Sequence, residues 1–445
     1  MHVVFFMTNT PLGYSGGRYH AVLMAEALSA TGHEVTICTN NKPVFFDEFE
    51  QLPAHDSIRI LLSSSIAAKP EGNVDVVVVV PHGGPAPWLY DRALCFAREC
   101  EARVVLLNFE SPNWFNTYSP EPRDPDLWEG WVQVSRHADM ILSSAAESTK
   151  YAKEFYVETP EHTLFRHCGP PINSIVADSV QQPPKQKQIL CITRMGTRNA
   201  HKGGGELLKA LCPALKGYTL LLMIGSGNVD DALMEELTQR ANKFGAEVEV
   251  ACSLTDREKF NRIKQSSMML FLSHFEGFGY PPVEAEYCDV PCIVYDLPVL
   301  REVSGEGLIY VPPGDGEALR EAITAVVEGH PDCADNLSER IAPQVSFSSR
   351  MAELDELIKE VSDLDTPAAA PSATDETAQR WKRSILKWRI LRPFVFGRRQ
   401  AARAKNFLRR LARRAALKVM VILARPVRRV SPEFVNLVKL RVLGE

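Results

Sequence analysis

Five consecutive valines, at residues 76–80, constrain the fold more than any other feature of the sequence. Such a run has no polar side to offer to solvent, so as a strand it must be buried on both faces. Further strands are expected at residues 3–8, 34–39, 103–108 and 140–143, with stretches of helical periodicity between them, for example residues 17–31. Apolar strands that alternate with helices predict a parallel sheet with helices on both faces.

The same alternation restarts after a polar, proline-containing stretch. Strands are expected at residues 189–193, 219–224, 247–251, 268–272 and 292–295, and helices at residues 206–214, 231–244 and 257–265 and after Pro282. We therefore expect an α/β fold with two doubly wound, Rossmann-like domains that face each other across a cleft. Ligands of such folds bind at the carboxyl ends of the strands, where loops lead into helices.

The domain organisation follows from these shifts in pattern. We expect a first Rossmann-like domain (1–176), a linker (177–188), a second Rossmann-like domain (189–345), a closing helix (346–365), a low-complexity linker (366–379) and a basic amphipathic helical tail (380–445).

The segment from Glu276 to Glu284, EGFGYPPVE, carries the strongest functional signal. Gly277 and Gly279 let backbone approach a ligand closely and present N–H groups, and the following helix start favours phosphate. The two carboxylates accept hydrogen bonds strongly, which suits a ligand with hydroxyl groups beside its phosphates. A nucleotide sugar has this layout. A capping or solvated role for Glu284 alone is the alternative.

This segment resembles the glutamate–seven–glutamate motif of the retaining GT-B glycosyltransferases of glycosyltransferase family 4. The resemblance covers roughly residues 1–361. It includes the Gly16-Gly17 turn, the Arg194…Lys202-Gly203 segment, Gly225-Ser226-Gly227 and the run at residues 291–303. Each piece is weak alone, but their order along the chain is specific.

The resemblance implies roles for the residues in the second domain, which binds the nucleotide sugar in that family. Glu276 would contact hydroxyls of the donor sugar, and the backbone of Gly277, Phe278 and Gly279 would lie along it. Glu284 would hold the ribose. Arg194 and Lys202 would neutralise the diphosphate as the leaving group develops charge. Solvated surface positions are the alternative for both cations. Thr193 replaces the usual glycine before Arg194, so Arg198 is an alternative partner.

The first domain would then lie on the acceptor side. Gly16 and Gly17 are expected to approach the donor phosphate or sugar, with an ordinary glycine turn as the alternative. Glu110 stands where the family often has a histidine, and we expect it near the anomeric carbon unless it only caps the following helix. His82 and Trp114 are candidates for acceptor contact, although such residues are more often part of a core.

These features favour a retaining glycosyltransferase that moves a hexose-type sugar from a nucleotide-diphosphate sugar to a glycan or lipid-linked acceptor. The alternative is a non-catalytic GT-B subunit of a glycan-assembly complex. Family members of this kind are thought to use front-face displacement, so no nucleophile is nominated. We identify no DxD-type metal site, and we expect no metal and no cofactor besides the donor.

The charge of the chain is divided unevenly. Residues 380–445 hold 20 Lys and Arg against Glu433 and Glu445, which gives this tail +18 and the remaining chain −23. Trp381, Ile385 and Trp388 recur at helical spacing among these bases, as in helices that lie on anionic membranes. We expect the tail to hold a cytoplasmic enzyme on the inner membrane face. Docking on the acidic body or on a partner, and less so nucleic-acid binding, are the alternatives.

We expect neither a signal peptide nor a transmembrane helix. Residues 1–7 lack the basic region and cleavage site of a signal peptide, and no run of about 20 apolar residues is present. The ten cysteines are scattered without zinc-ligand spacing, which favours buried thiols in a reducing compartment.

Overall fold

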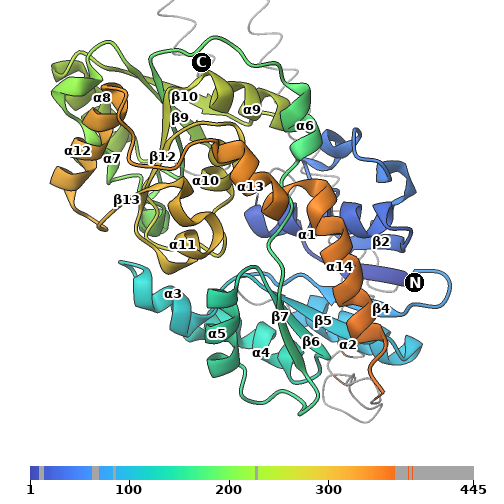
Figure 1. The fold of residues 1–445 in the computed structure, drawn as a ribbon. Helices are drawn as coiled ribbons and strands as arrows, with labels where there is room; N and C mark the ends of the chain where they lie inside the picture. Colours follow the sequence, from blue (N-terminus) through green and yellow to red (C-terminus); the bar gives the residue numbers. More distant parts are fainter. Residues whose placement is uncertain are drawn as a thin grey trace, which may run out of the picture. The chain divides into compact units, whose positions relative to one another are not determined.

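The computed structural model describes residues 1–9, 15–62, 70–83, 87–225, 229–365, 379 and 383. The described residues up to 365 belong to one compact unit. Two fully parallel sheets form its framework (Figure 1), as the strand pattern predicts. The predicted linker 366–379 and the basic tail lie outside the described residues, apart from Gln379 and Arg383.

The first sheet, with the helices around it, forms what we call the N lobe. Its strand order is β3-β2-β1-β4-β5-β6-β7. The strands are β1 (His2–Phe6), β2 (Glu34–Thr39), β3 (Arg59–Leu62), β4 (Val76–Val79), β5 (Arg103–Asn108), β6 (Met140–Ser143) and β7 (Leu164–His167). The helices are α1 (Gly16–Ala30), α2 (Pro87–Cys100), α3 (Pro112–Tyr118), α4 (Glu129–Ser135) and α5 (Ala146–Phe155).

The second sheet and its helices form the C lobe. Its strand order is β10-β9-β8-β11-β12-β13. The strands are β8 (Gln188–Thr193), β9 (Thr219–Ile224), β10 (Glu247–Cys252), β11 (Met268–Phe271), β12 (Cys292–Tyr295) and β13 (Ile309–Val311). The helices are α7 (Leu207–Ala210), α8 (Asp231–Lys243), α9 (Asp256–Gln265), α10 (Tyr280–Tyr287), α11 (Pro298–Ser304), α12 (Gly316–Val327) and α13 (Leu337–Val345).

The valine run occupies the middle of the first sheet. All four residues of β4 are fully buried, and the strand pairs in parallel with β1 and β5 on its two sides. Alternate valines enter two separate cores, because Val77 and Val79 pack with α2 and α4 whereas Val76 and Val78 pack with α1. This burial on both faces explains why the strand carries no polar residue.

One predicted helix is shorter than the sequence pattern suggested. The prediction of a helix over residues 206–214 is wrong, because α7 ends at Ala210 and Cys212 is extended. Pro213 is the physical reason, since a proline disfavours helical backbone at the residue before it. A separate short turn, Pro213–Leu215, follows.

Two stretches of chain cross between the lobes side by side. The first passes Ile172 and leads into α6 (Ser174–Ser179), and the second joins α13 to the last helix, α14 (Phe347–Ser362). The amide of Ile172 donates to the carbonyl of Val345, 2.8 Å away, and the amide of Phe347 donates to Ser174 Oγ at 3.1 Å. Helix α14, orange in Figure 1, then packs against α1 of the N lobe, where Ile358 is fully buried.

Candidate functional site

The site forms at the carboxyl ends of the C-lobe strands, where two loops meet. The Glu276 loop (residues 272–279) connects β11 to α10, and a short 3-10 helix, Thr197–Lys202, follows β8. At the end of that helix Gly203 has a φ of +70°, and a Cβ there would lie 1.8 Å from the carbonyl oxygen of Leu272. Only glycine allows this conformation and this approach.

Hydrogen bonds then fix the two loops together. The carbonyl of His201 accepts from Ser273 Oγ at 3.0 Å and from the amide of His274 at 2.7 Å. Thr193 Oγ1 donates to the carbonyl of Lys202 at 2.7 Å. Thr193, which replaces a glycine in the pattern that the sequence resembles, therefore ties the end of β8 to the segment that carries Lys202.

The central contact is an ion pair between two predicted site residues. Lys202 Nζ lies 2.8 Å from Glu276 Oε1, and the Glu276 side chain is only 10% exposed. The pair places a positive charge directly beside the carboxylate that is predicted to accept hydrogen bonds from the donor sugar. The structure thus brings together the predicted sugar-binding acid and the predicted phosphate-binding base.

The Glu276 loop also touches the N lobe directly. Ser144 Oγ donates to the carbonyl of Gly277 at 2.6 Å. A Cβ on Gly277 would meet the carbonyl oxygen of Phe109 at 2.6 Å, so the backbones of the two lobes are in contact here. Gly279 has a φ of +95° and turns the chain into α10. Pro281 and Pro282 follow in the first turn of α10 and have no N–H group. An anion at this helix start would therefore accept hydrogen bonds mainly from the backbone amides of the loop.

A group of cations surrounds a buried histidine between these loops. Burial, together with the charges of Lys202, Arg123 and Arg194, lowers the pKa of His201 to about 2. His201 is therefore neutral. Arg194 Nη1 lies 3.4 Å from Asn199 Oδ1. The side chain of the alternative residue, Arg198, lies outside the described set.

Glu110 approaches this group from the N lobe. Its Oε1 lies 3.1 Å from Arg123 Nη1, and the Arg123 guanidinium lies 3.9 Å from the centre of the Phe115 ring. Burial raises the pKa of Glu110, the positive charges of Arg123 and Lys202 oppose that rise, and Glu276 adds to it. Glu110 is thus electrostatically coupled to the Lys202–Glu276 pair.

The start of α1 forms another part of the N-lobe face. A Cβ on Gly16 would have no atom within 4 Å, whereas a Cβ on Gly17 would lie 2.9 Å from the Phe109 ring. Arg18 Nε donates to the carbonyl of Thr8 at 3.1 Å. Arg18 Nη2 and His82 Nδ1 are buried and have no hydrogen-bond partner among the described residues. Burial and the Arg18 charge lower the pKa of His82.

Two aromatic residues of the prediction are buried in packing contacts. Trp114 is 1% exposed and meets the Phe275 ring edge-on at 4.9 Å between centroids. Phe278 is 6% exposed and packs with Ile172 and Val283. An acceptor contact by Trp114 stays a prediction. Because the side chain of Phe278 is buried, only the backbone of this residue can face a donor, and that contact also stays a prediction.

Glu284 lies deeper than the other predicted residues. Its side chain is 3% exposed, and its Oε1 lies 2.6 Å from Lys259 Nζ. Burial raises the pKa of Glu284, and the charge of Lys259 opposes the rise. The ribose-binding role of Glu284 stays a prediction.

Sequence reasoning did not find Arg123, His201 or Lys259. Each reaches the site through tertiary contacts, and their local sequences contain no recognised motif. The position of His201 directly before Lys202 was the one available signal.

Comparison with known proteins shows what the C lobe and the fold resemble. Residues 176–344, which carry the Glu276 loop and Lys202, match the family model described as "Glycosyl transferases group 1". The two-sheet architecture is a GT-B fold.

Particular relatives narrow the comparison. Over 215 residues the chain is 26% identical to the O-antigen chain mannosyltransferase RfbU of Salmonella typhimurium. This alignment covers 47% of this chain and 57% of that protein. Over 241 residues it is 25% identical to the serotype-specific mannosyltransferase WbdA of Escherichia coli, covering 50% of this chain and 28% of that protein. The match therefore spans little more than half the length of RfbU and little more than a quarter of the length of WbdA.

Solved structures share the fold at low sequence identity. Sucrose-phosphate synthase from Thermosynechococcus elongatus superposes with a TM-score of 0.59 and 15% identity, over 81% of this chain and 98% of that chain. Anabaena HepE in complex with UDP and glucose superposes with a TM-score of 0.59 and 15% identity, over 82% of this chain and 100% of that chain.

The contact between Gly277 and Phe109 makes a prediction about stability. Gly277→Ala places a methyl group against a backbone oxygen that cannot rotate away, so we expect the free energy of unfolding to fall by about 1–3 kcal/mol. Urea denaturation followed by circular dichroism measures it. Gly205→Ala is the control, since its Cβ would have no atom within 4 Å. Equal effects of the two substitutions would contradict the close contact between the lobes.

Proposed function

We propose that this protein is a retaining glycosyltransferase that moves a hexose from a nucleoside-diphosphate sugar to a glycan or lipid-linked acceptor. The observation that carries the proposal is the Lys202–Glu276 pair, at 2.8 Å, on the loop that leads into α10. This pair lies within the segment that matches the glycosyltransferase model. The N-lobe carboxylate Glu110 and its partner Arg123 face the same group of charges.

The proposed reaction follows from the charges present. The bond between the anomeric carbon and the β-phosphate oxygen breaks, and the acceptor oxygen bonds to the same face of that carbon. The acceptor proton passes to the departing phosphate. Lys202, supported by Arg194, stabilises the negative charge that develops on this phosphate. Glu276 accepts hydrogen bonds from sugar hydroxyls.

Mannose is the sugar we favour. The two curated relatives described above are named an O-antigen chain mannosyltransferase and a serotype-specific mannosyltransferase. The structural neighbour HepE holds UDP and glucose, which supports a nucleotide-sugar donor without fixing the base. We propose that the product is part of a cell-surface polysaccharide.

The charge of Lys202 is the first test of this function. We expect the wild-type protein to hydrolyse at least one of GDP-mannose, UDP-glucose and UDP-N-acetylglucosamine slowly without acceptor. Lys202→Met keeps the side-chain length but removes the charge, so the hydrolysis rate should fall by about 100-fold. Product nucleotide is measured by chromatography, with and without EDTA.

The controls for this assay separate charge from folding. Lys209→Met removes an exposed lysine of α7 and should leave the rate unchanged, and Lys202→Arg should retain part of it. Absence of hydrolysis and of binding in the wild-type protein would favour the non-catalytic GT-B subunit. Inverted anomeric configuration in the product, read by NMR, would contradict retention, and loss of turnover with EDTA would contradict a metal-free reaction.

Glu110 gives a second prediction. Glu110→Gln keeps the shape but removes the charge beside Arg123 and Lys202, so we expect the turnover number to fall by about tenfold or more. Steady-state kinetics with the preferred donor measures it, and Glu161→Gln at an exposed loop position is the control. Near-normal turnover would leave Glu110 a structural partner of Arg123.

We also propose that the basic tail binds the anionic inner face of a membrane. None of the helices among the described residues is long and apolar enough to cross a bilayer. The proposal rests on the sequence of residues 380–445, with its +18 charge and interleaved tryptophans.

Vesicle flotation tests the tail. The full chain should float with vesicles containing about 30% phosphatidylserine, and a chain ending at residue 379 should not. Binding should weaken in high salt, because screening removes the attraction between surface charges. Equal flotation of both chains, or equal binding to zwitterionic vesicles, would contradict the membrane role.

A further inference from the structure

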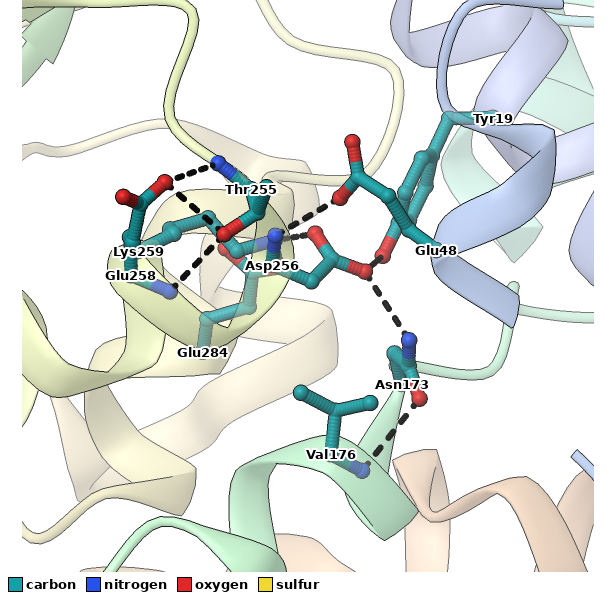
Figure 2. A network of polar contacts seen from close by, with 9 residues as sticks. All are labelled: Tyr19, Glu48, Asn173, Val176, Thr255, Asp256, Glu258, Lys259 and Glu284. Atoms are coloured by element: carbon teal, nitrogen blue, oxygen red, sulfur yellow. Dashed lines mark hydrogen bonds and ion pairs between the residues drawn. The ribbon is translucent and has the colours of Figure 1, made fainter. Parts of the chain in front are cut away.

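A buried polar network joins the two lobes beside the candidate site (Figure 2). At its centre is Asp256, the first residue of α9 in the C lobe, which is 4% exposed. Its Oδ2 accepts hydrogen bonds from the Tyr19 hydroxyl of α1 and from Asn173 Nδ2, the latter at 2.9 Å. The network thus connects the C lobe to the N lobe and to one crossing segment.

Lys259 extends this network toward the Glu276 loop. Its Nζ lies 2.9 Å from Asp256 Oδ1 and 2.6 Å from Glu284 Oε1, and it lies 5.2 Å from the centre of the Tyr19 ring. Burial would lower the pKa of Lys259, but the carboxylates of Asp256 and Glu284 raise it above its usual range. One ammonium group therefore holds two buried carboxylates.

A second N-lobe residue reaches the same helix end. Glu48, on the 3-10 helix Phe46–Phe49, accepts a hydrogen bond from the amide of Asp256 through Oε2 at 2.6 Å. Within the C lobe, Thr255 and Glu258 cap the same helix start. The first turn of α9 is therefore held from both lobes, so Asp256 and Lys259 have a fixed position.

The network links two parts of the proposed donor site that lie on different lobes. Tyr19 lies within the first turn of α1, directly after the Gly16-Gly17 start. Glu284 lies on α10, directly after the Glu276 loop. An unbroken series of contacts runs from Tyr19 through Asp256 and Lys259 to Glu284.

We propose that Tyr19, Asp256 and Lys259 are positioning residues, which hold the Glu284 carboxylate oriented and ionised for the ribose of the donor. Nucleotide binding by the C lobe then depends on a hydroxyl group of the N lobe that does not touch the nucleotide. The inference rests on the proposed function and on the predicted role of Glu284.

The physical argument concerns the charge of a buried carboxylate. Glu284 can accept hydrogen bonds from ribose hydroxyls with both oxygens only while it is ionised. Without Lys259, burial and the nearby Asp256 would both favour the protonated form. Without the Tyr19 hydroxyl, Asp256 would lose a neutral donor, and Lys259 would shift toward Asp256 and away from Glu284.

The first test uses isothermal calorimetry of the full chain with UDP and with GDP as probes. Tyr19→Phe keeps the ring and should weaken binding of the preferred diphosphate about tenfold, which corresponds to about 1.4 kcal/mol. Tyr287→Phe is the matched control, because it removes a tyrosine–aspartate hydrogen bond of 3.0 Å, to Asp178. The control should bind as the wild type does.

The second test uses the charge of Lys259. Lys259→Met should weaken binding more at the lower than at the higher end of a pH series, because loss of the ammonium group leaves burial and Asp256 to raise the pKa of Glu284 further, and the protonated fraction of a carboxyl group grows as the pH falls. Lys259→Arg should restore most of the affinity. Asp256, Glu48, Tyr19 and Cys288 also face this region, so the ratio to wild type is taken at each pH. A purely structural role would give a ratio that does not change with pH.

The outcomes separate this inference from the proposed function. If the wild type binds a diphosphate and Tyr19→Phe binds it equally well, the inference is overturned while the proposed function stands. If the wild type binds neither probe and hydrolyses no donor, both fall. If circular dichroism shows that Lys259→Met does not fold, the calorimetric comparison of Tyr19→Phe with Tyr287→Phe decides whether the inference holds.

Discussion

The approach of the Gly203 backbone to the carbonyl of Leu272 is the constraint on which the candidate site depends. A Cβ at residue 203 would lie 1.8 Å from that oxygen, so no other residue allows the contact. The approach brings the segment after β8 against the loop after β11, two neighbouring strands of one parallel sheet. The carbonyl of His201 then accepts hydrogen bonds from Ser273 and His274, and Lys202 forms an ion pair with Glu276. One glycine thus allows a base and an acid, 74 residues apart, to form a single charged pair.

Charge in the site is arranged in pairs rather than as a single cationic pocket. Lys202 faces Glu276 in the C lobe, and Arg123 faces Glu110 in the N lobe. Since Lys202 and Arg123 each have an acid partner, these two bases add little net charge where the lobes approach each other. The pKa of Glu110 responds to both Lys202 and Glu276, so the two pairs form one electrostatic unit.

The sequence predicted the interior of each sheet well and the edges poorly. Strands such as β4 are apolar throughout because they are buried on both faces, and this pattern is visible in the sequence. The strands that were not predicted, β3, β7 and β13, all lie at sheet edges, where partial exposure permits residues such as Arg59 and Arg166. The Glu276 loop and Lys202 could be predicted because each lies in a short segment that resembles a family motif. The contacts of Arg123 and Lys259 could not, because they depend on how separate elements pack.

The paired crossing between the lobes determines how one lobe can move relative to the other. The chain enters the C lobe near Ile172 and leaves it near Val345, and the two passages are hydrogen-bonded to each other. In topological terms the C lobe is an insertion in the N lobe, since α14 returns to pack on α1. Two adjacent crossing segments that are hydrogen-bonded to each other resist twisting and separation more than a single linker does. Any rotation of one lobe against the other must therefore bend both passages together, near residues 172 and 345.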